Sequence, residues 1–472
     1  MSARAKTAGI RSTQSLRGKK ESAMKLRGTF NKRCQVAMYA AFLSIGLWLA
    51  AGPEAAACSN VFVAGTNETT GGVEYAAVAR SMDVEDFLGE VFGYGLVDWK
   101  NESNINIPQS GPPNPMRWRN AYGFIGQTVL GTFILTDGVN TEGLYGGLLE
   151  LPGFTQYPEF NPQDDRPELG VLDVITYALG TARDVLDLVD PDSRTGKLLD
   201  VQLVLNAAEV KVVVLKVFRG FPSHMVFRDK NGNSAVIEWI KGKTHFYVHR
   251  AGTSEVVEIV DGEPNYWKVY QGTEGAVLTN APPFGWHLKH VEPLRKNHRY
   301  FTGNTGRKWH GAYMNGSGLF GLEGDYTPVS RFVRASILAR LYPEAKTQNQ
   351  AMYAAYSVLQ SVIVPPGSNP SPTAWVSWVD LPNSIYNFKP LIRPLAINKP
   401  THTLSVALVE ENLYNWQSYK CKDIVDGGGN PPDDWVKVQV HSKDVAPNPD
   451  KIRNEIKKKT EGNFVQEVFF VQ

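Results

Sequence analysis

The chain has 472 residues, of which 42% are hydrophobic and 20% are charged, and this composition is typical of a large globular protein with an extensive core. Its formal net charge of +2 arises in the first 57 residues, which hold ten Lys and Arg against two Glu; without them the charge is −6. The remainder lacks the strongly basic surface that nucleic-acid binding requires, so we expect no nucleic-acid partner.

The first 57 residues have the organisation of a secretory signal peptide. A basic segment ends at Arg33, an apolar run occupies 36–52, and three alanines precede Cys58. Either Met1 or Met24 could start this leader. We predict cleavage just before Cys58 and export to the periplasm or the medium. No later apolar run approaches 18 residues, which predicts no membrane contact once the leader is removed.

Cleavage would make Cys58 the first residue of the mature chain and place a thiol and a free α-amine on one residue. A deprotonated thiol is a strong nucleophile, and an α-amine with a pKa of roughly 7.7–8.0 suits a general base near neutral pH. Two alternatives remain open: Cys58 only marks the cut, or it carries the lipid of an anchor. Such anchors usually have a larger aliphatic residue at the position of Ala55. A disulfide to Cys421 would also consume the thiol.

Strand patterns and helical blocks follow along the chain. The order of strands, helices and strands again predicts an α+β layered domain rather than alternating βαβ units. We assign 58–420 to this domain and 421–472 to a polar extension of unknown role. We expect helices at 168–190, 330–341 and 350–364, and strands at 58–64, 73–79, 129–135, 144–151, 223–227, 235–239, 244–249, 277–280, 373–380, 384–388 and 404–409.

The first predicted hairpin would bring Arg80 and Asp83 back towards Cys58. An arginine close to a thiol favours the thiolate, and an aspartate can hold an α-ammonium or orient the amine. An ordinary surface Arg–Asp pair is the alternative. Residues 137–143 suit a tight turn because Gly and Asn tolerate left-handed backbone conformations. Asn140 is therefore either a turn residue or a contact for the substrate or its oxyanion.

Six motifs in this order resemble those of the choloylglycine hydrolase family, a branch of the N-terminal nucleophile hydrolases: Cys58 itself, ARSMD at 79–83, GVNTEGL at 138–144, SAVIE at 234–238, LTNAP at 278–282 and GDYTPVSRF at 324–332. The family contains bile salt hydrolases and penicillin V acylases, and the resemblance runs from Cys58 to about residue 380. It implies a four-layer αββα sandwich with the cysteine at the end of a central strand. It also implies hydrolysis of linear amide C–N bonds, and we expect no metal and no cofactor.

Carried over by position, the resemblance makes Cys58 the nucleophile, with its own α-amine moving the proton. Arg80 and Asp83 flank it, Asn280 helps to bind the oxyanion, and Arg331 completes the polar cluster. A tetrahedral oxyanion needs fixed hydrogen-bond donors. Asn280 suits this role because a pair of prolines follows shortly after it and restricts the backbone.

Glu150 is the main departure from the family pattern. It falls where bile salt hydrolases have an Asn and penicillin V acylases have a Tyr that assists the oxyanion. A carboxylate there would repel a developing negative charge. We therefore predict that Glu150 is not an oxyanion donor and that bile salts are disfavoured as substrates. The loop between Cys58 and Arg80 is also a few residues longer than in the family.

These patterns together predict an exported amidohydrolase, a homo-oligomer acting on a small N-acyl amide similar to penicillin V, an N-acyl homoserine lactone or a conjugated bile acid. The alternative is a non-catalytic or lipid-anchored exported binding protein on the same fold. A papain-type cysteine protease would need a separate His base, and no flanking pattern of that class surrounds Cys58.

Overall fold

The computed structural model describes residues 58–83, 91–103, 114–128, 135–205, 222–296, 308–313, 321–391, 417–422 and 436–437, with gaps at 68, 96, 99, 273–274, 310–311 and 370. The chain divides into two units, Met1–Glu54 and Ala55–Gln472, and every described residue belongs to the second. The predicted signal peptide, the predicted strand at 404–409 and most of the one at 129–135 lie outside the described residues.

Six antiparallel strands form the sheet that contains the N-terminal hairpin. Their order is β16-β1-β2-β19-β20-β21, so the hairpin strands β1 and β2 have a neighbour on each side. Both are continuous runs of mainly apolar residues, as expected for strands buried on two faces. The strands are Ser59–Thr66 (β1), Val73–Asp83 (β2), Val277–Thr279 (β16), Thr373–Asp380 (β19), Ile385–Pro390 (β20) and Gln417–Lys420 (β21).

Nine antiparallel strands form the second sheet, in the order β15-β14-β13-β12-β11-β8-β7-β6-β3. The strands are Val91–Gly95 (β3), Phe124–Thr128 (β6), Leu135–Asn140 (β7), Leu144–Glu150 (β8), Ser223–Asp229 (β11), Ser234–Ile240 (β12), Lys243–His249 (β13), Glu255–Val260 (β14) and Glu263–Gln271 (β15). Short pairings are made by Lys100–Glu102 (β4), Arg117–Arg119 (β5), Glu168–Gly170 (β9), Gln202–Val204 (β10), Lys308–Trp309 (β17), Ala312–Tyr313 (β18) and Val436–Lys437 (β22).

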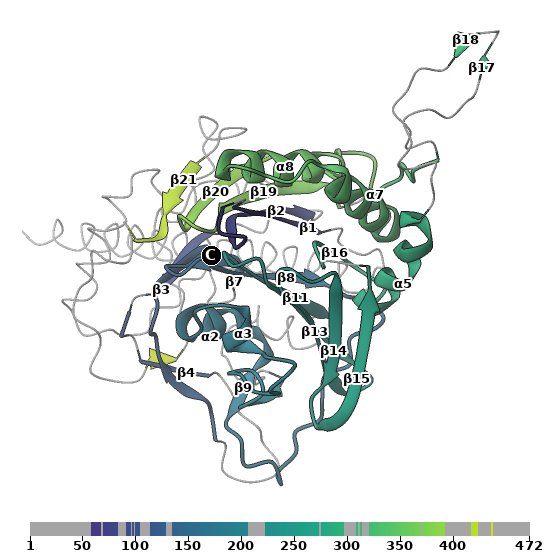
Figure 1. Ribbon diagram of the computed structural model, residues 1–472. Helices are drawn as coiled ribbons and strands as arrows, with labels where there is room; N and C mark the ends of the chain where they lie inside the picture. The colour runs from purple at the N-terminus through teal and green to yellow at the C-terminus, as the bar shows by residue number, and fades with distance from the viewer. Residues whose placement is uncertain are drawn as a thin grey trace, which may run out of the picture. The chain divides into compact units, whose positions relative to one another are not determined.

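Helices cover the outer face of each sheet (Figure 1). Helices α7 and α8 contact β1 of the six-stranded sheet, whereas α2 contacts β7 and β8 and α3 contacts β11 of the nine-stranded sheet. Helix α5 packs against α7. The order of layers is therefore helix, sheet, sheet, helix. The helices are Val171–Asp173 (η1), Val174–Thr181 (α2), Val185–Leu188 (α3), Phe284–Arg295 (α5), Pro328–Leu341 (α7) and Gln348–Gln360 (α8).

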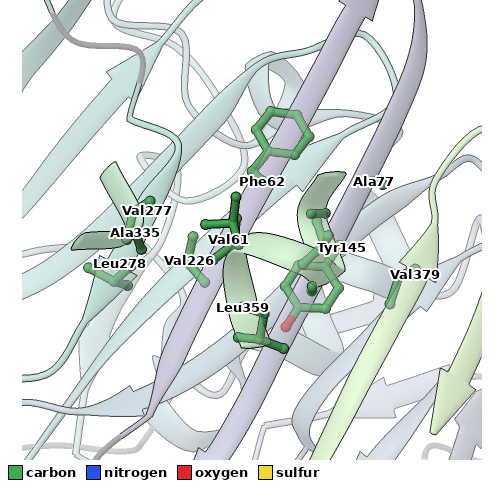
Figure 2. Packing of buried hydrophobic residues seen from close by; sticks show 14 of the residues in the cluster. Val61, Phe62, Ala77, Tyr145, Val226, Val277, Leu278, Ala335, Leu359 and Val379 are labelled. Carbon is green, nitrogen blue, oxygen red and sulfur yellow. The ribbon is translucent and has the colours of Figure 1, made fainter. Parts of the chain in front are cut away.

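Two hydrophobic cores hold these layers together. The first contains Val61 of β1 and Val379 of β19 from one sheet, Tyr145 of β8 and Val226 of β11 from the other, and Leu359 of α8 (Figure 2). The second lies between the nine-stranded sheet and α2 and α3. Each fully buried aliphatic or aromatic side chain contributes about 1.5–3 kcal/mol relative to exposure. Apolar packing of this extent can offset the free-energy cost of burying a polar cluster at the site.

The predicted α+β fold with four αββα layers is confirmed by this arrangement. Most predicted helices and strands coincide with observed elements within a few residues, but residues 168–170, predicted as helix, form strand β9, and residues 137–140, predicted as part of a turn, belong to β7. Helix α5 is the main addition: Pro283 precedes it and Pro293 lies inside it, and prolines usually interrupt a helical pattern. Among the described residues, no helix is long and apolar enough to span a membrane.

Part of the C-terminal region joins the sheets. Strand β21 pairs with β20, and Cys421, directly after it, is buried in the first core. Strand β22 pairs with β4. Residues 417–422 and 436–437 therefore pair with or pack against the described part of the fold, while the remainder of the predicted extension at 421–472 lies outside the described residues.

Candidate active site

Cys58 lies directly before β1, where the ends of neighbouring strands meet. Strand β1 pairs with β2 and β16 so that Ser59 is opposite both Ser81 and Thr279. Carried one residue further, the same register places Cys58 opposite Asn280. The sequence separates these two residues widely, and the antiparallel pairing of β1 and β16 brings them together.

The Cys58 thiol is buried among polar groups, with 2% of the residue exposed. Its Sγ lies 3.5 Å from Sδ of Met82 and accepts the backbone N–H of Asp83. Burial raises the pKa of the thiol to about 12; Arg80 opposes this shift, and the Asp83 and Glu150 carboxylates add to it. Because the thiol holds its proton in this state, a base must remove that proton for Cys58 to act as a nucleophile.

Arg331 connects Cys58 to Asn280. It lies in the first turn of α7, which Thr327 caps through its side chain. Its Nη1 donates to the Cys58 carbonyl oxygen at 2.7 Å and to Ser59 Oγ at 2.5 Å, and its Nη2 donates to Asn280 Oδ1 at 3.0 Å. One planar guanidinium group therefore fixes the position of the cysteine relative to the amide of Asn280.

The Asn280 side chain has one N–H hydrogen that no described residue accepts. Arg331 can only donate hydrogen bonds, so the Asn280 atom it contacts is the oxygen and the nitrogen lies on the other side of the amide. Nδ2 donates to the Glu150 carbonyl oxygen at 2.9 Å, and the described part of the chain provides no further acceptor for it. An amide nitrogen carries two hydrogens, so the second can be donated to a substrate oxygen.

Helix α5 holds the backbone of Asn280. His287 Nε2 lies 3.0 Å from the Asn280 carbonyl oxygen, which can only accept, so Nε2 carries the hydrogen. Burial lowers the pKa of His287 to about 3. The imidazole therefore stays neutral and keeps this hydrogen bond at ordinary pH. The ring also stacks on Phe332 of α7, with ring centroids 4.4 Å apart.

Asp83 lies at the end of β2 beside Cys58. Thr373 Oγ1 donates to its Oδ1, and Arg331 Nη1 lies 3.8 Å from its Oδ2. That Oδ2 atom is buried and has no hydrogen-bond partner among the described residues. Burial raises the pKa of Asp83 to about 7, although Arg331 and Thr373 act to lower it.

We expect Asp83 to make the stability of the full-length chain depend on pH. Its pKa is about 7 in the fold against an ordinary value of 3.8, so between about pH 4 and 7 the folded protein keeps a proton that the unfolded chain has lost. The free energy of unfolding should therefore fall as pH rises through this window, by an amount on the order of a few kcal/mol. Thermal unfolding of the parent and of Asp83→Asn across this window tests the expectation. An equally steep decline in the variant would contradict it.

Arg80 reaches from β2 into the space between the sheets. Its side chain is fully buried, and Nη2 donates to the Leu148 carbonyl oxygen. Nη1 lies 3.6 Å from Oδ1 of Asp137, and the guanidinium lies over the Trp375 ring at 5.1 Å from its centroid. Because it opposes the rise in the thiol pKa, Arg80 is a buried positive charge that acts on Cys58.

The comparisons with known proteins agree with this geometry. Residues 68–257 and 243–391 match the model of the linear amide C–N hydrolases of the choloylglycine hydrolase family, which spans more than half of the chain. The chain belongs to the choloylglycine hydrolase family. The predictions of an amide hydrolase and of this family are confirmed.

Several members of the family can be aligned with this hydrolase. It is 26% identical over 254 residues to the conjugated bile acid hydrolase of Lactobacillus acidophilus, covering 51% of this chain and 68% of that protein. It is 23% identical over 329 residues to the penicillin V acylase of Pectobacterium atrosepticum, covering 63% and 73%. The penicillin V acylase structure from Agrobacterium tumefaciens superposes with a TM-score of 0.50 at 20% identity, covering 77% of this chain and 91% of that one. A conjugated bile acid hydrolase variant from Clostridium perfringens gives 0.52 at 18% identity, covering 77% and 97%.

Glu150 of the hydrolase is the last residue of β8, and its backbone meets the site. Its carbonyl oxygen accepts the hydrogen bond from Asn280. The charge of its side chain raises the pKa of the Cys58 thiol. The prediction that this carboxylate is not an oxyanion donor stays a prediction.

Asn140 ends β7, and its side chain serves the fold. Nδ2 donates to the carbonyl oxygens of Leu179 and Ala182 at 3.0 and 2.8 Å, and Oδ1 accepts the backbone N–H groups of Glu142 and Leu144 at 3.0 and 2.9 Å. Both amide hydrogens and both acceptor positions are occupied. This arrangement leaves Asn140 no N–H for an oxyanion and favours the turn role over the substrate role.

Replacing Asn140 with alanine should therefore reduce stability rather than chemistry. The variant leaves two carbonyls and two N–H groups of a buried turn without partners, so we expect a loss of about 2–5 kcal/mol in the free energy of unfolding. At a temperature where the variant is folded, kcat should change less than about threefold. Urea unfolding and amide hydrolysis by the same preparation check both parts. A variant as stable as the parent but inactive would contradict them.

The structure shows no disulfide between the two cysteines of the domain. Cys421 Sγ lies 3.6 Å from the carbonyl oxygens of Gly123 and Val139, whereas Cys58 Sγ faces Met82. The alternative in which Cys421 consumes the thiol is therefore not supported. Among the residues that the structure describes, no group of His, Cys, Asp and Glu is arranged to hold a metal ion.

The structure brings the five predicted catalytic residues close together, and sequence reasoning did not name the residues that support them. Cys58, Arg80, Asp83, Asn280 and Arg331 are all within one network of contacts. The supporting residues are Ser59, Met82, Asp137 and Thr373. Ser59 and Met82 could have been found from strand register alone, because each is adjacent to a predicted site residue. Asp137 and Thr373 depend on how the two sheets and their distant strands meet.

Proposed function

We propose that this family member is an exported amidohydrolase in which removal of the leader makes Cys58 the N-terminal nucleophile. The observation that supports this most is the Arg331 guanidinium, which holds the Cys58 carbonyl and the Asn280 amide side by side. A nucleophile and an oxyanion donor must be fixed relative to each other before the substrate arrives. Membership of a family of linear amide C–N hydrolases supports the same reaction.

The proposed reaction begins with transfer of the thiol proton to the α-amine of Cys58. The sulfur attacks the amide carbonyl carbon, and the resulting oxyanion accepts the spare N–H of Asn280. Collapse of the tetrahedral intermediate forms a thioester, while the α-ammonium returns the proton to the leaving amine. Water, deprotonated by the same amine, then hydrolyses the thioester and restores the thiol.

Asp83 is suited to stabilise the positive charge of a protonated α-amine at the new N-terminus. Its buried Oδ2 has no hydrogen-bond partner within the described residues, so it can accept an N–H from an α-ammonium at Cys58. A positive charge at that point would also stabilise the Asp83 carboxylate, whose pKa is about 7 in the full-length chain. Processing would then favour the anionic form of Asp83 whenever the α-amine carries a proton.

Mass spectrometry of the exported protein tests the proposal together with an activity assay. A mature chain beginning at an unmodified Cys58 that hydrolyses an N-acyl amide supports it. A diacylglyceryl adduct on Cys58 and no hydrolysis would support the alternative, an anchored binding protein. Penicillin V, an N-acyl homoserine lactone and a glycine-conjugated bile acid form the substrate panel, and light scattering of the same sample tests the expected homo-oligomer.

Glu150 gives a reason to expect unequal results across that panel. The negative charge of Glu150 raises the pKa of the Cys58 thiol. We also predict that Glu150 donates no hydrogen bond to the oxyanion. We expect weak turnover of the conjugated bile acid compared with the other two substrates. Preferred hydrolysis of the bile acid would overturn this part of the proposal and leave the nucleophile assignment intact.

A further inference from the structure

Asp137 lies at the centre of a buried polar cluster that the proposed reaction does not use. It is on β7 and has no exposed surface. Its Oδ1 accepts the Tyr386 hydroxyl at 2.7 Å and lies 3.6 Å from Arg80 Nη1. Its Oδ2 accepts Ser377 Oγ at 2.6 Å and the Tyr145 hydroxyl at 3.2 Å. The Asp137 carboxyl group thus accepts three hydroxyl hydrogen bonds and has a guanidinium group nearby.

The cluster crosses from one sheet to the other. Arg80, Ser377 and Tyr386 come from the adjacent strands β2, β19 and β20 of the six-stranded sheet, whereas Asp137 belongs to the nine-stranded sheet. Glycine is required opposite Asp137: a Cβ at Gly147 would lie 2.7 Å from the Tyr145 hydroxyl oxygen. The backbone thus leaves space for a hydroxyl to reach this carboxylate.

Arg80 is shared between Asp137 and the nucleophile. Although burial acts to lower the pKa of Arg80, Asp137 and then Tyr145 and Cys58 keep it above its ordinary value, so the guanidinium stays charged. The same cation acts to lower the pKa of the Cys58 thiol. Arg80 Nη1 lies 3.6 Å from Asp137 Oδ1, and its Nη2 lies 3.7 Å from Met82 Sδ, the atom that Cys58 Sγ also contacts at 3.5 Å. The Asp137 carboxylate and a thiolate at Cys58 would therefore compete for one positive charge.

We propose that Asp137 is a positioning residue that sets how strongly Arg80 stabilises the thiolate of Cys58. Its three hydroxyl partners take part of its negative charge and so leave more of the Arg80 charge for the sulfur. This inference rests on the proposed role of Cys58 as nucleophile. It assigns no contact between Asp137 and the substrate.

Other charges act on the same thiol and must be kept constant. Among the groups named here, only Arg80 faces both the thiol and Asp137. The charged and titratable groups facing Cys58 are Arg80 and Asp83 of β2, Glu150 of β8 and Arg331 of α7, and those facing Asp137 are Arg80, Tyr145 of β8 and Tyr386 of β20. Variants at Asp137 and Tyr386 leave every other member of both sets in place.

The test is the pH dependence of Cys58 alkylation by iodoacetamide in the full-length chain, with the modified peptide quantified by mass spectrometry. In Asp137→Asn, Arg80 loses its competing anion, so thiolate should form at lower pH. In Tyr386→Phe, Asp137 loses a hydrogen-bond donor and attracts Arg80 more strongly, so thiolate should form at higher pH. We expect alkylation below the midpoint to change about threefold or more in each case, in opposite directions.

Tyr177→Phe is the matched control, because it removes a buried tyrosine hydroxyl from the other core. It should leave the alkylation profile unchanged. A purely structural role of Asp137 would lower the melting temperature of both test variants without moving their profiles. Unmoved profiles, or shifts in one common direction, would overturn the proposal.

If Asp137→Asn does not fold, Tyr386→Phe decides alone: an upward shift supports the proposal and any other result overturns it. Peptide mapping separates Cys58 from Cys34 and Cys421. The alkylation readout does not require amide hydrolysis, so failure of the proposed function would be visible separately, as an inactive protein with the expected shifts.

Discussion

Replacing Cys58 with alanine should abolish amide hydrolysis and leave the fold unchanged. Among the described residues, the side chain to which the thiol hydrogen bonds is Met82, whereas the hydrogen bond from Arg331 goes to the Cys58 backbone carbonyl, which alanine retains. Loss of a catalytic nucleophile removes the covalent route altogether, so kcat should fall by a factor on the order of 10⁴ or more. Steady-state hydrolysis of the active panel substrate, with circular dichroism of the same sample, measures both expectations.

Cys421→Ala is the control for this experiment. It removes the other cysteine described by the structure, which is also fully buried but lies against carbonyl groups of the core. We expect a modest loss of stability and nearly full activity. If Cys58→Ala retained more than about a tenth of the parent activity, sulfur could not be the nucleophile, and the proposed reaction would have to be abandoned.

Replacing Asn280 with alanine should lower kcat by about 100- to 1000-fold, with a small change in KM. Removing one oxyanion donor typically costs this much because the interaction is made mainly in the transition state. The variant also removes the acceptor for Arg331 Nη2, so part of the loss could come from movement of Arg331. Asn280→Asp separates these effects, since it keeps the oxygen for Arg331 and removes the N–H group.

Both Asn280 variants should therefore be strongly impaired, and Asn280→Asp at least as severely as Asn280→Ala at neutral pH. Asn383→Ala is a suitable control because the Asn383 amide bonds to the Asp380 carboxylate at an exposed turn. An Asn280→Asp variant with near-parent kcat would show that Asn280 serves only to hold Arg331.

The sequence contained enough to predict the layers and the central residues of the site. The apolar runs of β1 and β2 and the turn between them fix the hairpin, and the hairpin register brings Arg80 and Asp83 to Cys58. Six ordered motifs then supply Asn280 and Arg331. The hairpin is a local signal, whereas the six motifs are informative because of their order along the chain.

The remainder could not be predicted because it depends on which hydrogen-bonding groups are satisfied in three dimensions. Asn140 ends a strand and Asn280 follows one, and both lie beside turn-forming residues. Asn140 nevertheless has its four hydrogen-bonding positions filled, whereas Asn280 has one N–H hydrogen that no described residue accepts. Asp137 begins the segment 137–143 that the sequence predicts to be a turn, whereas the structure places it in β7. Only the packing of one sheet on the other shows that it meets Arg80.

Arg331 donates its hydrogen bond at Cys58 to the backbone carbonyl oxygen, an atom that every amino acid has. The inactive Cys58→Ala variant should therefore keep the substrate-binding site intact. Crystals of Cys58→Ala soaked with candidate amides could then capture an intact ligand and reveal its acyl chain directly.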